Sequence, residues 1–120
     1  MSREGFRGLV VWHRAKALAV AVYRATDEGR ISRDFGLRDQ MRRAAVSVCS
    51  NIAEGEDRGS DKDSVRFFRI AKGSLAELRA QVELAVALDL LDAETAERLE
   101  SDALDVTRMI TALIKVRSPQ

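Results

Sequence analysis

The fold is decided by one stretch of the chain, RRAAVSVCSNIAEG at residues 42–55. It contains no proline, and its apolar residues and those just before it recur at steps of one, three and four residues. These residues are Leu37, Met41, Ala44, Ala45, Val48 and Ile52. That spacing places them on one side of an α-helix, so the stretch predicts a helix with a single apolar stripe facing a core.

The same helix carries two further rows. A polar seam beside the stripe consists of Gln40, Arg43, Ser47, Asn51 and Glu54. A third row, which we place opposite the stripe, consists of Arg42, Val46, Cys49 and Ala53. An ordinary surface helix would expose charged residues there, whereas this row is mostly small or apolar. We therefore expect this helix to lie at the centre of the subunit and to contact a second subunit.

Length and composition indicate one all-α domain. The chain has 120 residues, 46% of them hydrophobic and 5% aromatic, and its single proline lies at the C-terminus. Periodicity and turn composition predict four helices at about residues 9–28, 36–56, 61–89 and 93–116, after a flexible arm at residues 1–8. Because the three connections are short, the helices of residues 9–117 should form an antiparallel up-down-up-down four-helix bundle.

Capping residues mark the ends of these helices. Gly29 can adopt the left-handed backbone conformation that ends a helix, here the first one. Ser32 or Asp34 can cap the start of the second helix. Ser60 or Asp61 can begin the third helix, and Asp92 the fourth. The first helix also has little polar surface, which again suggests two neighbours. The residues that we expect at a subunit interface are Ala17, Val20, Ala21, Val46, Cys49 and Ala53.

The third helix has a core stripe and a polar row of its own. The stripe runs through Val65, Phe68, Ala71, Leu75, Leu78 and Val82, and we expect the mid-helix Gly73 to mark the close approach of another helix. The polar row is Ser74, Glu77 and Gln81. Two interpretations of the facing seams remain open: a hydrogen-bond network that fixes helix register, or a small-molecule or anion site. We favour the network, because these polar groups can satisfy one another without a ligand.

The sequence lacks the residue patterns of the common metal-binding, nucleophilic and phosphate-binding sites. With His13 and Cys49 as its only histidine and cysteine, the sequence offers no metal site, no Glu-x-x-His motif and no nucleophile–base pair. It also lacks a glycine-rich phosphate loop. We expect no cofactor and no enzymatic activity, although a nucleophilic Cys49 remains an alternative. A lone cysteine without an apolar leader fits the cytoplasm, and no run is long enough to span a membrane.

Charge is close to balanced overall, at a formal +1, so the chain is not a strongly basic nucleic-acid binder. Residues 1–60 hold 11 Lys/Arg against 8 Asp/Glu, and residues 61–120 hold 9 against 11. Candidates for contact with a phosphate backbone are Arg58, Lys62, Arg66 and Arg69, which Arg38, Arg42 and Lys72 extend. The alternative is a solvated face, since Asp57, Asp61 and Asp63 lie among them. Acidic residues dominate 89–105, where only Arg98 is basic.

Several motifs resemble one family, the small bacterial four-helix-bundle proteins named for 23S rRNA intervening sequences. They are Leu9-Val10-Val11-Trp12, Phe35-Gly36-Leu37 with Gln40 and Arg42-Arg43-Ala44, Ser47 with Asn51-Ile52-Ala53-Glu54-Gly55, and Phe67-Phe68 with Ile70-Ala71, Gly73-Ser74 and Glu77-Leu78. The segment before Phe35 departs from the pattern by lacking a proline that is frequent there.

The resemblance implies a left-handed antiparallel bundle that assembles as a ring, a homopentamer, and associates loosely with ribosomal RNA insertions. A relative in diversity-generating retroelements forms a basic pentameric barrel that binds its reverse transcriptase and nucleic acid, whereas this chain is near neutral. No catalytic residues are implied. We thus expect a non-enzymatic oligomeric bundle that associates weakly with ribosomal or other structured RNA, or with a ribonucleoprotein. The alternative is a protein-interaction scaffold or accessory subunit that binds no nucleic acid.

Overall fold

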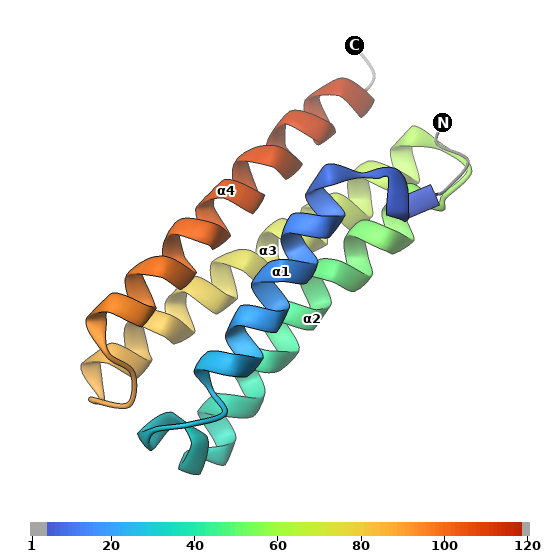
Figure 1. The fold of residues 1–120 in the computed structure, drawn as a ribbon. Helices are drawn as coiled ribbons and strands as arrows, with labels where there is room; N and C mark the ends of the chain where they lie inside the picture. The colour runs from blue at the N-terminus through green and yellow to red at the C-terminus, as the bar shows by residue number, and fades with distance from the viewer. Residues whose placement is uncertain (1–4, 119–120) are drawn as a thin grey trace.

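The structure, a computed structural model, describes residues 5–118 and consists of helices with short connections. The four long helices are α1 (Val10–Ala25), α2 (Phe35–Glu56), α3 (Asp61–Ala87) and α4 (Ala93–Arg117). Two short 3-10 helices, η1 (Gly5–Gly8) and η2 (Arg30–Arg33), precede α1 and α2. No β-strand occurs between residues 5 and 118. Successive long helices run in opposite directions, as expected for an antiparallel bundle (Figure 1).

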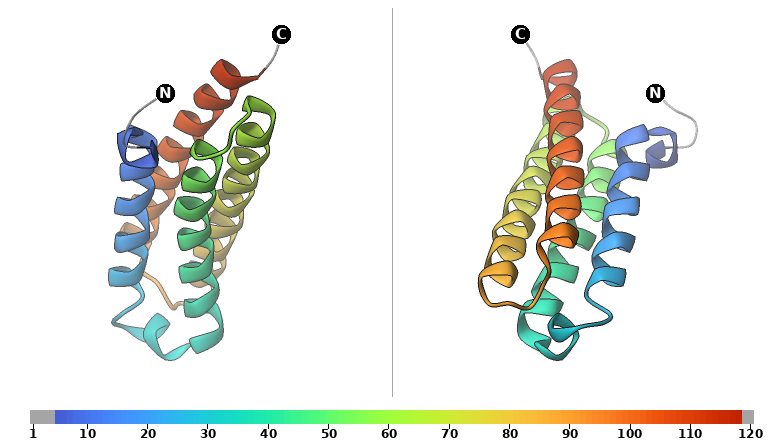
Figure 2. Two further views of the ribbon diagram at one scale, coloured as in Figure 1. Left: turned by 90° about the vertical axis from the view of Figure 1, so that its right-hand side faces the viewer. Right: turned by 60° about the vertical axis from the view of Figure 1, so that its left-hand side comes forward.

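The bundle is elongated, with extents of 45 × 25 × 21 Å. Each helix packs beside its neighbour in sequence, and α4 completes the bundle by lying next to α1 (Figure 2). The contact between α2 and α3 is the most extensive, and the contact between α1 and α4 is the least. None of the helices between residues 5 and 118 has a stretch both long and apolar enough to cross a bilayer.

Side-chain caps fix the starts of α2, α3 and α4, whereas Leu9 before α1 makes no such bond. Asp34 accepts a hydrogen bond from the backbone N–H of Leu37 (3.0 Å), and Ser60 accepts one from that of Asp63 (3.3 Å). At the start of α4, Asp92 accepts bonds from both the backbone N–H (2.8 Å) and the hydroxyl of Thr95 (2.9 Å). Of the alternative caps that the sequence offered, Asp34 and Ser60 are therefore the ones used.

Two expectations about the N-terminal region need correction. α1 ends at Ala25 instead of about residue 28, and Gly29, with φ +72°, precedes η2 instead of ending α1. Residues 5–8, expected in a flexible arm, form η1, whose Phe6 ring lies 4.7 Å from that of Trp12. The rest of that arm, residues 1–4, lies outside the described part of the chain.

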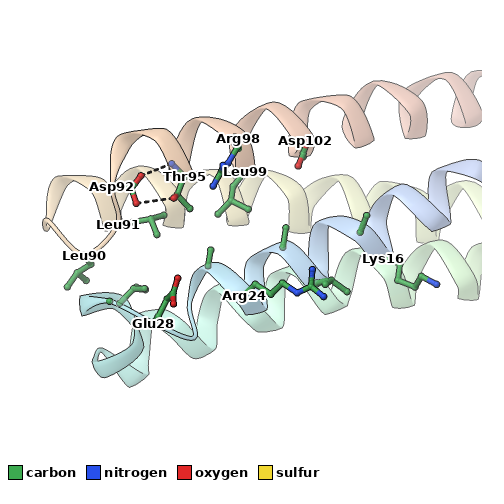
Figure 3. A pocket seen from close by; sticks show the side chains of 16 residues that line it. Lys16, Arg24, Glu28, Leu90, Leu91, Asp92, Thr95, Arg98, Leu99 and Asp102 are labelled. Carbon is green, nitrogen blue, oxygen red and sulfur yellow. Dashed lines mark hydrogen bonds between the residues drawn. The ribbon is translucent and has the colours of Figure 1, made fainter.

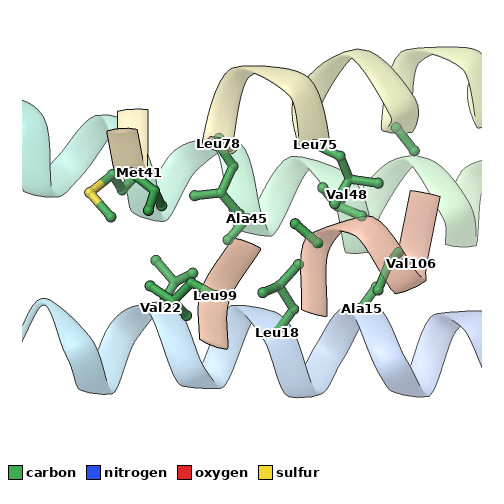
Figure 4. Close-up of a cluster of buried hydrophobic side chains, with 14 of the residues drawn as sticks. Ala15, Leu18, Val22, Met41, Ala45, Val48, Leu75, Leu78, Leu99 and Val106 are labelled. Carbon is green, nitrogen blue, oxygen red and sulfur yellow. The ribbon is translucent and has the colours of Figure 1, made fainter. Parts of the chain in front are cut away.

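The core is mainly aliphatic, with Phe68 as its largest buried side chain, and it draws on all four helices (Figure 4). Fully buried residues include Leu18, Val22, Met41, Ala45, Val48, Leu75, Leu78 and Val106. The apolar stripe of α2 is therefore confirmed as a core face. On α3 the buried face is shifted slightly from the expected one, since Ser64 is buried while Val65 is only half-buried. Burial of Ser64 is possible because its hydroxyl donates to the Gly55 carbonyl (2.6 Å).

The close approach of two helices occurs at Gly55 and not at Gly73, which corrects the prediction. A Cβ added to Gly73 would meet nothing within 4 Å. A Cβ added to Gly55 would lie 2.6 Å from Cε1 of Phe68 and 3.1 Å from the carbonyl oxygen of Ser64. Gly55 thus lets the start of α3 pack directly against the end of α2.

Candidate nucleic-acid interface

The polar seams of α2 and α3 meet at three residues. The hydroxyls of Ser47 and Ser74 lie 2.8 Å apart and share a hydrogen bond. Asn51 donates from Nδ2 to the Ser47 carbonyl (2.9 Å) and to its hydroxyl (3.1 Å). These contacts support the interpretation of a network that joins α2 to α3, because each group is satisfied by the protein itself.

The remaining seam residues do not join that network, so the expected extent of the network was too large. Glu54 instead forms an ion pair with Arg58, four residues later in the sequence (2.8 Å). The Oε1 atom of Gln81 is buried without a hydrogen-bond partner among the described residues. Gln40, Arg43 and Glu77 are exposed to solvent. The seam is therefore reduced to the hydrogen bonds among Ser47, Asn51 and Ser74, which we call the polar clasp. It offers no cluster of free polar groups that could bind a ligand.

The row of α2 that we placed opposite the core turns towards α1 instead. Arg42 donates from Nε to the Thr26 hydroxyl just after α1 (2.9 Å). Cys49 packs against the edge of the core, and Ala53 is half-buried. Of this row only Val46, 42% exposed, is freely available. A second helix does cover this side of α2, but it belongs to the same chain.

Burial also answers the question of a nucleophilic Cys49. Desolvation raises the pKa of its thiol from 9.0 to about 11, against a smaller opposing effect of its own backbone hydrogen bond and of the Lys16 charge. A thiol with this pKa is protonated near neutral pH and is a poor nucleophile. Among the residues that the structure describes, no group of three or more His, Cys, Asp or Glu side chains could hold a metal ion.

The expected interface residues of α1 lie along a groove between α1 and α4 (Figure 3). The groove has a volume of about 840 Å³, and Ala17, Val20 and Ala21 line its α1 side. Its charged residues include three cations and three anions: Lys16, Arg24, Arg98, Glu28, Asp92 and Asp102. Because both signs line the groove in equal number, it does not select a ligand of either charge.

The seven candidate basic residues fall into two groups at opposite ends of α2. Arg38 and Arg42 lie near its N-terminus, whereas Arg58 follows its C-terminus. The 16 residues from 42 to 58 correspond to about 24 Å of helix. Arg38 is engaged locally, donating to the Ser32 carbonyl (3.1 Å) and to Asp39 (2.9 Å). Together with the bonded Arg42, it organises the α1–α2 connection.

The second group begins around the ring of Phe67. The guanidinium groups of Arg58 and Arg66 lie 4.5 and 4.6 Å from the centroid of that ring. Arg58 also pairs with Glu54, so part of its charge is already compensated. Lys62, Arg66, Arg69 and Lys72 form no ion pair within the described part of the chain. Arg69 and Lys72 line a hollow of about 280 Å³ with Thr111 and Ile114 of α4.

The pairing of α3 with α4 enlarges this group. Arg79 of α3 and Glu100 of α4 form an ion pair (3.3 Å) across the two antiparallel helices. Arg69 and Lys72 of α3 line one hollow with Thr111 and Ile114 of α4. The segments around them, residues 64–73 and 106–118, therefore run side by side, and neither contains an acidic residue, although Asp61 and Asp63 flank Lys62. We use the term α3–α4 basic face for the cations gathered here: Lys62, Arg66, Arg69, Lys72, Arg108 and Lys115.

Sequence reasoning missed the contribution of α4 to this face. Arg108 and Lys115 were not among the basic candidates, although the absence of any acid after Asp105 was a visible signal. Arg108 keeps one local partner, Asp105 (3.1 Å), whereas Lys115 forms no ion pair within residues 5–118. The neighbouring Arg117 is different, because it donates to the buried Glu56 (2.7 Å) and so serves the fold.

Charge is separated along the α3–α4 pair. Beyond the basic face, residues 77–105 carry nine acidic residues and only two arginines, Arg79 and Arg98. The near-neutral total therefore conceals one basic and one acidic end. A negatively charged polymer would be attracted to the first and repelled by the second.

Comparison with known proteins agrees with the architecture. A family model described as 23S rRNA-intervening sequence protein matches residues 7–112. The chain belongs to this family. A crystal structure of a protein of unknown function from the S23 ribosomal protein family of Bacteroides thetaiotaomicron has the same fold, with a TM-score of 0.81 at 23% sequence identity. The match covers 88% of this chain and 99% of that one. No curated protein matches the chain in sequence.

The residues that suggested the 23S rRNA-intervening sequence family now have structural roles. Ser47, Asn51 and Ser74 form the polar clasp, and Gly55 accommodates the ring of Phe68. They all lie where α2 meets α3. The motif of this family member therefore accounts for the most extensive helix contact of the bundle, and not for the basic face.

Proposed function

We propose that this member of the 23S rRNA-intervening sequence family is a non-enzymatic protein that binds structured RNA weakly through the α3–α4 basic face. The observation that carries the proposal is the pairing of two acid-free helix segments. Through it, several cations without carboxylate partners among the described residues share one side of the bundle. The family description favours ribosomal RNA, or a ribonucleoprotein that contains it, as the binding partner.

The physical basis is release of counterions. Each phosphate that a lysine or arginine neutralises frees condensed cations, so affinity falls with salt by a slope of about 0.9 per contact on a duplex. Six cations on one subunit provide a modest number of such contacts. Binding by one subunit should therefore be weak near physiological salt, and an oligomer would strengthen it by presenting several faces at once.

We also propose that the protein is a cytoplasmic homo-oligomer, a ring of five subunits. Support comes from apolar side chains that remain exposed on α1 and α2, above all Val20, which borders the groove between α1 and α4, and Val46 on α2, at 42% each. α1 packs against α4 and α2 packs against α3 (Figure 2), and neither α1 nor α2 contributes a residue to the α3–α4 basic face. Self-association through α1 and α2 would thus leave the basic face accessible.

Binding of a labelled RNA hairpin, followed by fluorescence anisotropy at about 50 mM and about 200 mM salt, tests the RNA proposal. The triple variant Arg66→Gln/Arg69→Gln/Lys72→Gln should reduce affinity by about tenfold or more and lower the salt slope by about three. The matched control is Arg24→Gln/Arg30→Gln/Arg33→Gln, which removes the same charge at the other end of the bundle. Equal losses in both variants, or no salt-dependent binding by the parent, would refute the proposal.

A second candidate function is that of a protein-interaction scaffold without nucleic-acid binding. It is favoured by exposed apolar side chains on α3 and directly after it: Ile70, Leu84 and Leu88. Contact through these residues would be insensitive to salt, because it depends on apolar burial. Capture of one protein partner that persists at high salt, and is lost in Leu84→Glu/Leu88→Glu, would support this function over RNA binding.

A further inference from the structure

We infer that the α3–α4 basic face engages the phosphate backbone of a double-stranded segment, an RNA stem, and not a single strand. This inference rests on the proposed function and adds the class of nucleic acid. Three features of the face carry it: the arrangement of its cations, the lack of a stacking surface, and the absence of a track for one strand.

The cations form a two-dimensional array. Ten residues separate Lys62 from Lys72, which corresponds to about 15 Å along α3. Arg108 and Lys115 add a second line on α4, at the usual helix spacing of about 8–10 Å. A duplex carries one phosphate charge per roughly 1.7 Å of its axis, against about 3.4 Å for each strand. A rigid array spread over two helices therefore meets more phosphates on a duplex than on a single strand.

The face offers no aromatic surface on which a base could stack. Phe67 is the aromatic residue nearest to it, and its ring is already covered by Arg58 and Arg66, at 4.5 and 4.6 Å from the centroid. Phe68, the next residue of α3, is completely buried. Binding of single strands usually depends on base–aromatic stacking, which contributes about 1–3 kcal/mol per base. That contribution is missing from this face.

The face also lacks a channel that would follow one strand. Its hollow of about 280 Å³ is lined by Arg69, Lys72, Thr111 and Ile114, all on the regular helices α3 and α4. No loop lies between these residues to hold unstacked nucleotides apart. Proteins that read unpaired RNA splay its bases into such loops or pockets, whereas those that bind RNA duplexes contact phosphates and sugars across a regular surface. The α3–α4 basic face matches the second description.

The test compares one short labelled RNA strand, free of self-pairing, with the same strand annealed to its complement. Both probes are titrated with the full-length protein at about 50 mM salt and then at increasing salt. The duplex should bind about tenfold more tightly and show the steeper salt dependence. Arg66→Gln/Arg69→Gln/Lys72→Gln should weaken duplex binding, while Phe67→Leu, which removes the ring but keeps an apolar side chain, should leave it within about twofold.

The outcomes separate the two proposals. Equal or tighter binding of the single strand, still weakened by the triple variant, would overturn the duplex inference and leave RNA binding by this face intact. A loss of duplex affinity in Phe67→Leu as large as in the triple variant would also overturn it, because the ring would then contribute directly. Absence of salt-dependent binding to either probe would remove the proposed function itself.

Discussion

The ring of Phe68 lies directly on Gly55, so close that a Cβ at residue 55 would be 2.6 Å from its Cε1 atom. The contact joins the last turn of α2 to the second turn of α3. Since Phe68 is fully buried and the Ser64 carbonyl lies only 3.1 Å from the same point, neither neighbour has room to move. Glycine is therefore required here for packing and not for an unusual backbone conformation.

Gly55→Ala should destabilise the protein. Overpacking a filled site costs about 1–3 kcal/mol, which exceeds the gain of about 1 kcal/mol from replacing a helical glycine by alanine. We expect a net loss of about 1 kcal/mol in the free energy of unfolding, measured by urea denaturation followed by circular dichroism. A variant as stable as the parent would mean that Phe68 can shift at little cost.

Gly73→Ala is the matched substitution, and we expect it to change the free energy of unfolding in the opposite direction. Gly73 is also within a helix but faces open space, so alanine should stabilise the protein by about 1 kcal/mol. The same denaturation experiment measures it. A loss of stability would revive the expectation from the sequence that another helix approaches Gly73, in this case one from a second subunit.

Ser47 and Ser74 should be energetically coupled through the hydrogen bond between their hydroxyls. Ser47→Ala leaves the buried Ser74 hydroxyl without its partner on α2 and should cost about 1–2 kcal/mol. Ser74→Ala should cost a similar amount, and the double variant less than the sum of the two. A double-mutant cycle by urea denaturation measures this coupling; strictly additive losses would show that the hydroxyls do not depend on each other.

Arg117→Ala should destabilise the bundle because it leaves Glu56, 4% exposed, as a buried carboxylate without its partner. We expect a loss of about 2 kcal/mol in the free energy of unfolding. Adding Glu56→Gln should recover part of that loss, since it removes the uncompensated charge. Lys115→Ala, at an exposed position two residues earlier, is the control and should change stability by less than about 0.5 kcal/mol. Equal effects of the two single variants would contradict the structural role of Arg117.

Cys49 should react slowly with thiol reagents in the folded protein. A pKa of about 11 instead of 9.0 lowers the thiolate fraction about 100-fold near neutral pH, and the rate with a disulfide reagent should rise sharply in urea. Because the folded pKa is the higher one, the contribution of Cys49 to stability is present below pH 9.0 and is lost as pH rises towards about 11. Equal rates in the folded and unfolded protein would contradict this burial.

Val46→Glu and Val20→Glu should dissociate the proposed oligomer without unfolding the subunit, because both side chains are substantially exposed. The half-buried Ala53 is unsuitable, since a glutamate there would also disturb packing within the chain. Light scattering coupled to size-exclusion chromatography gives the mass, and circular dichroism gives the helicity. Val116→Glu, at an exposed position on α4, is the control. An unchanged mass in both test variants would place the subunit contact elsewhere.

The sequence by itself determined the helices, their core stripes and their caps. Met41, Val48 and Ile52 recur with the period of a helix, and only one side of the helix can be buried with that spacing. Asp34 and Ser60 cap the starts of α2 and α3 by hydrogen bonds to backbone N–H groups three residues later. Information of this kind lies within a few residues along the chain, which is why it could be predicted without knowing how the helices are arranged.

Only the tertiary structure decided which faces are free. Cys49 and Arg42 seemed available for a second subunit, but the side that they occupy is covered by α1 of the same chain. The basic face was equally hidden, because Arg69 and Lys72 are distant in sequence from the α4 residues Thr111 and Ile114 and meet them only through the packing of α3 against α4. Periodicity fixes where a side chain lies around its own helix, whereas packing between helices determines what it meets.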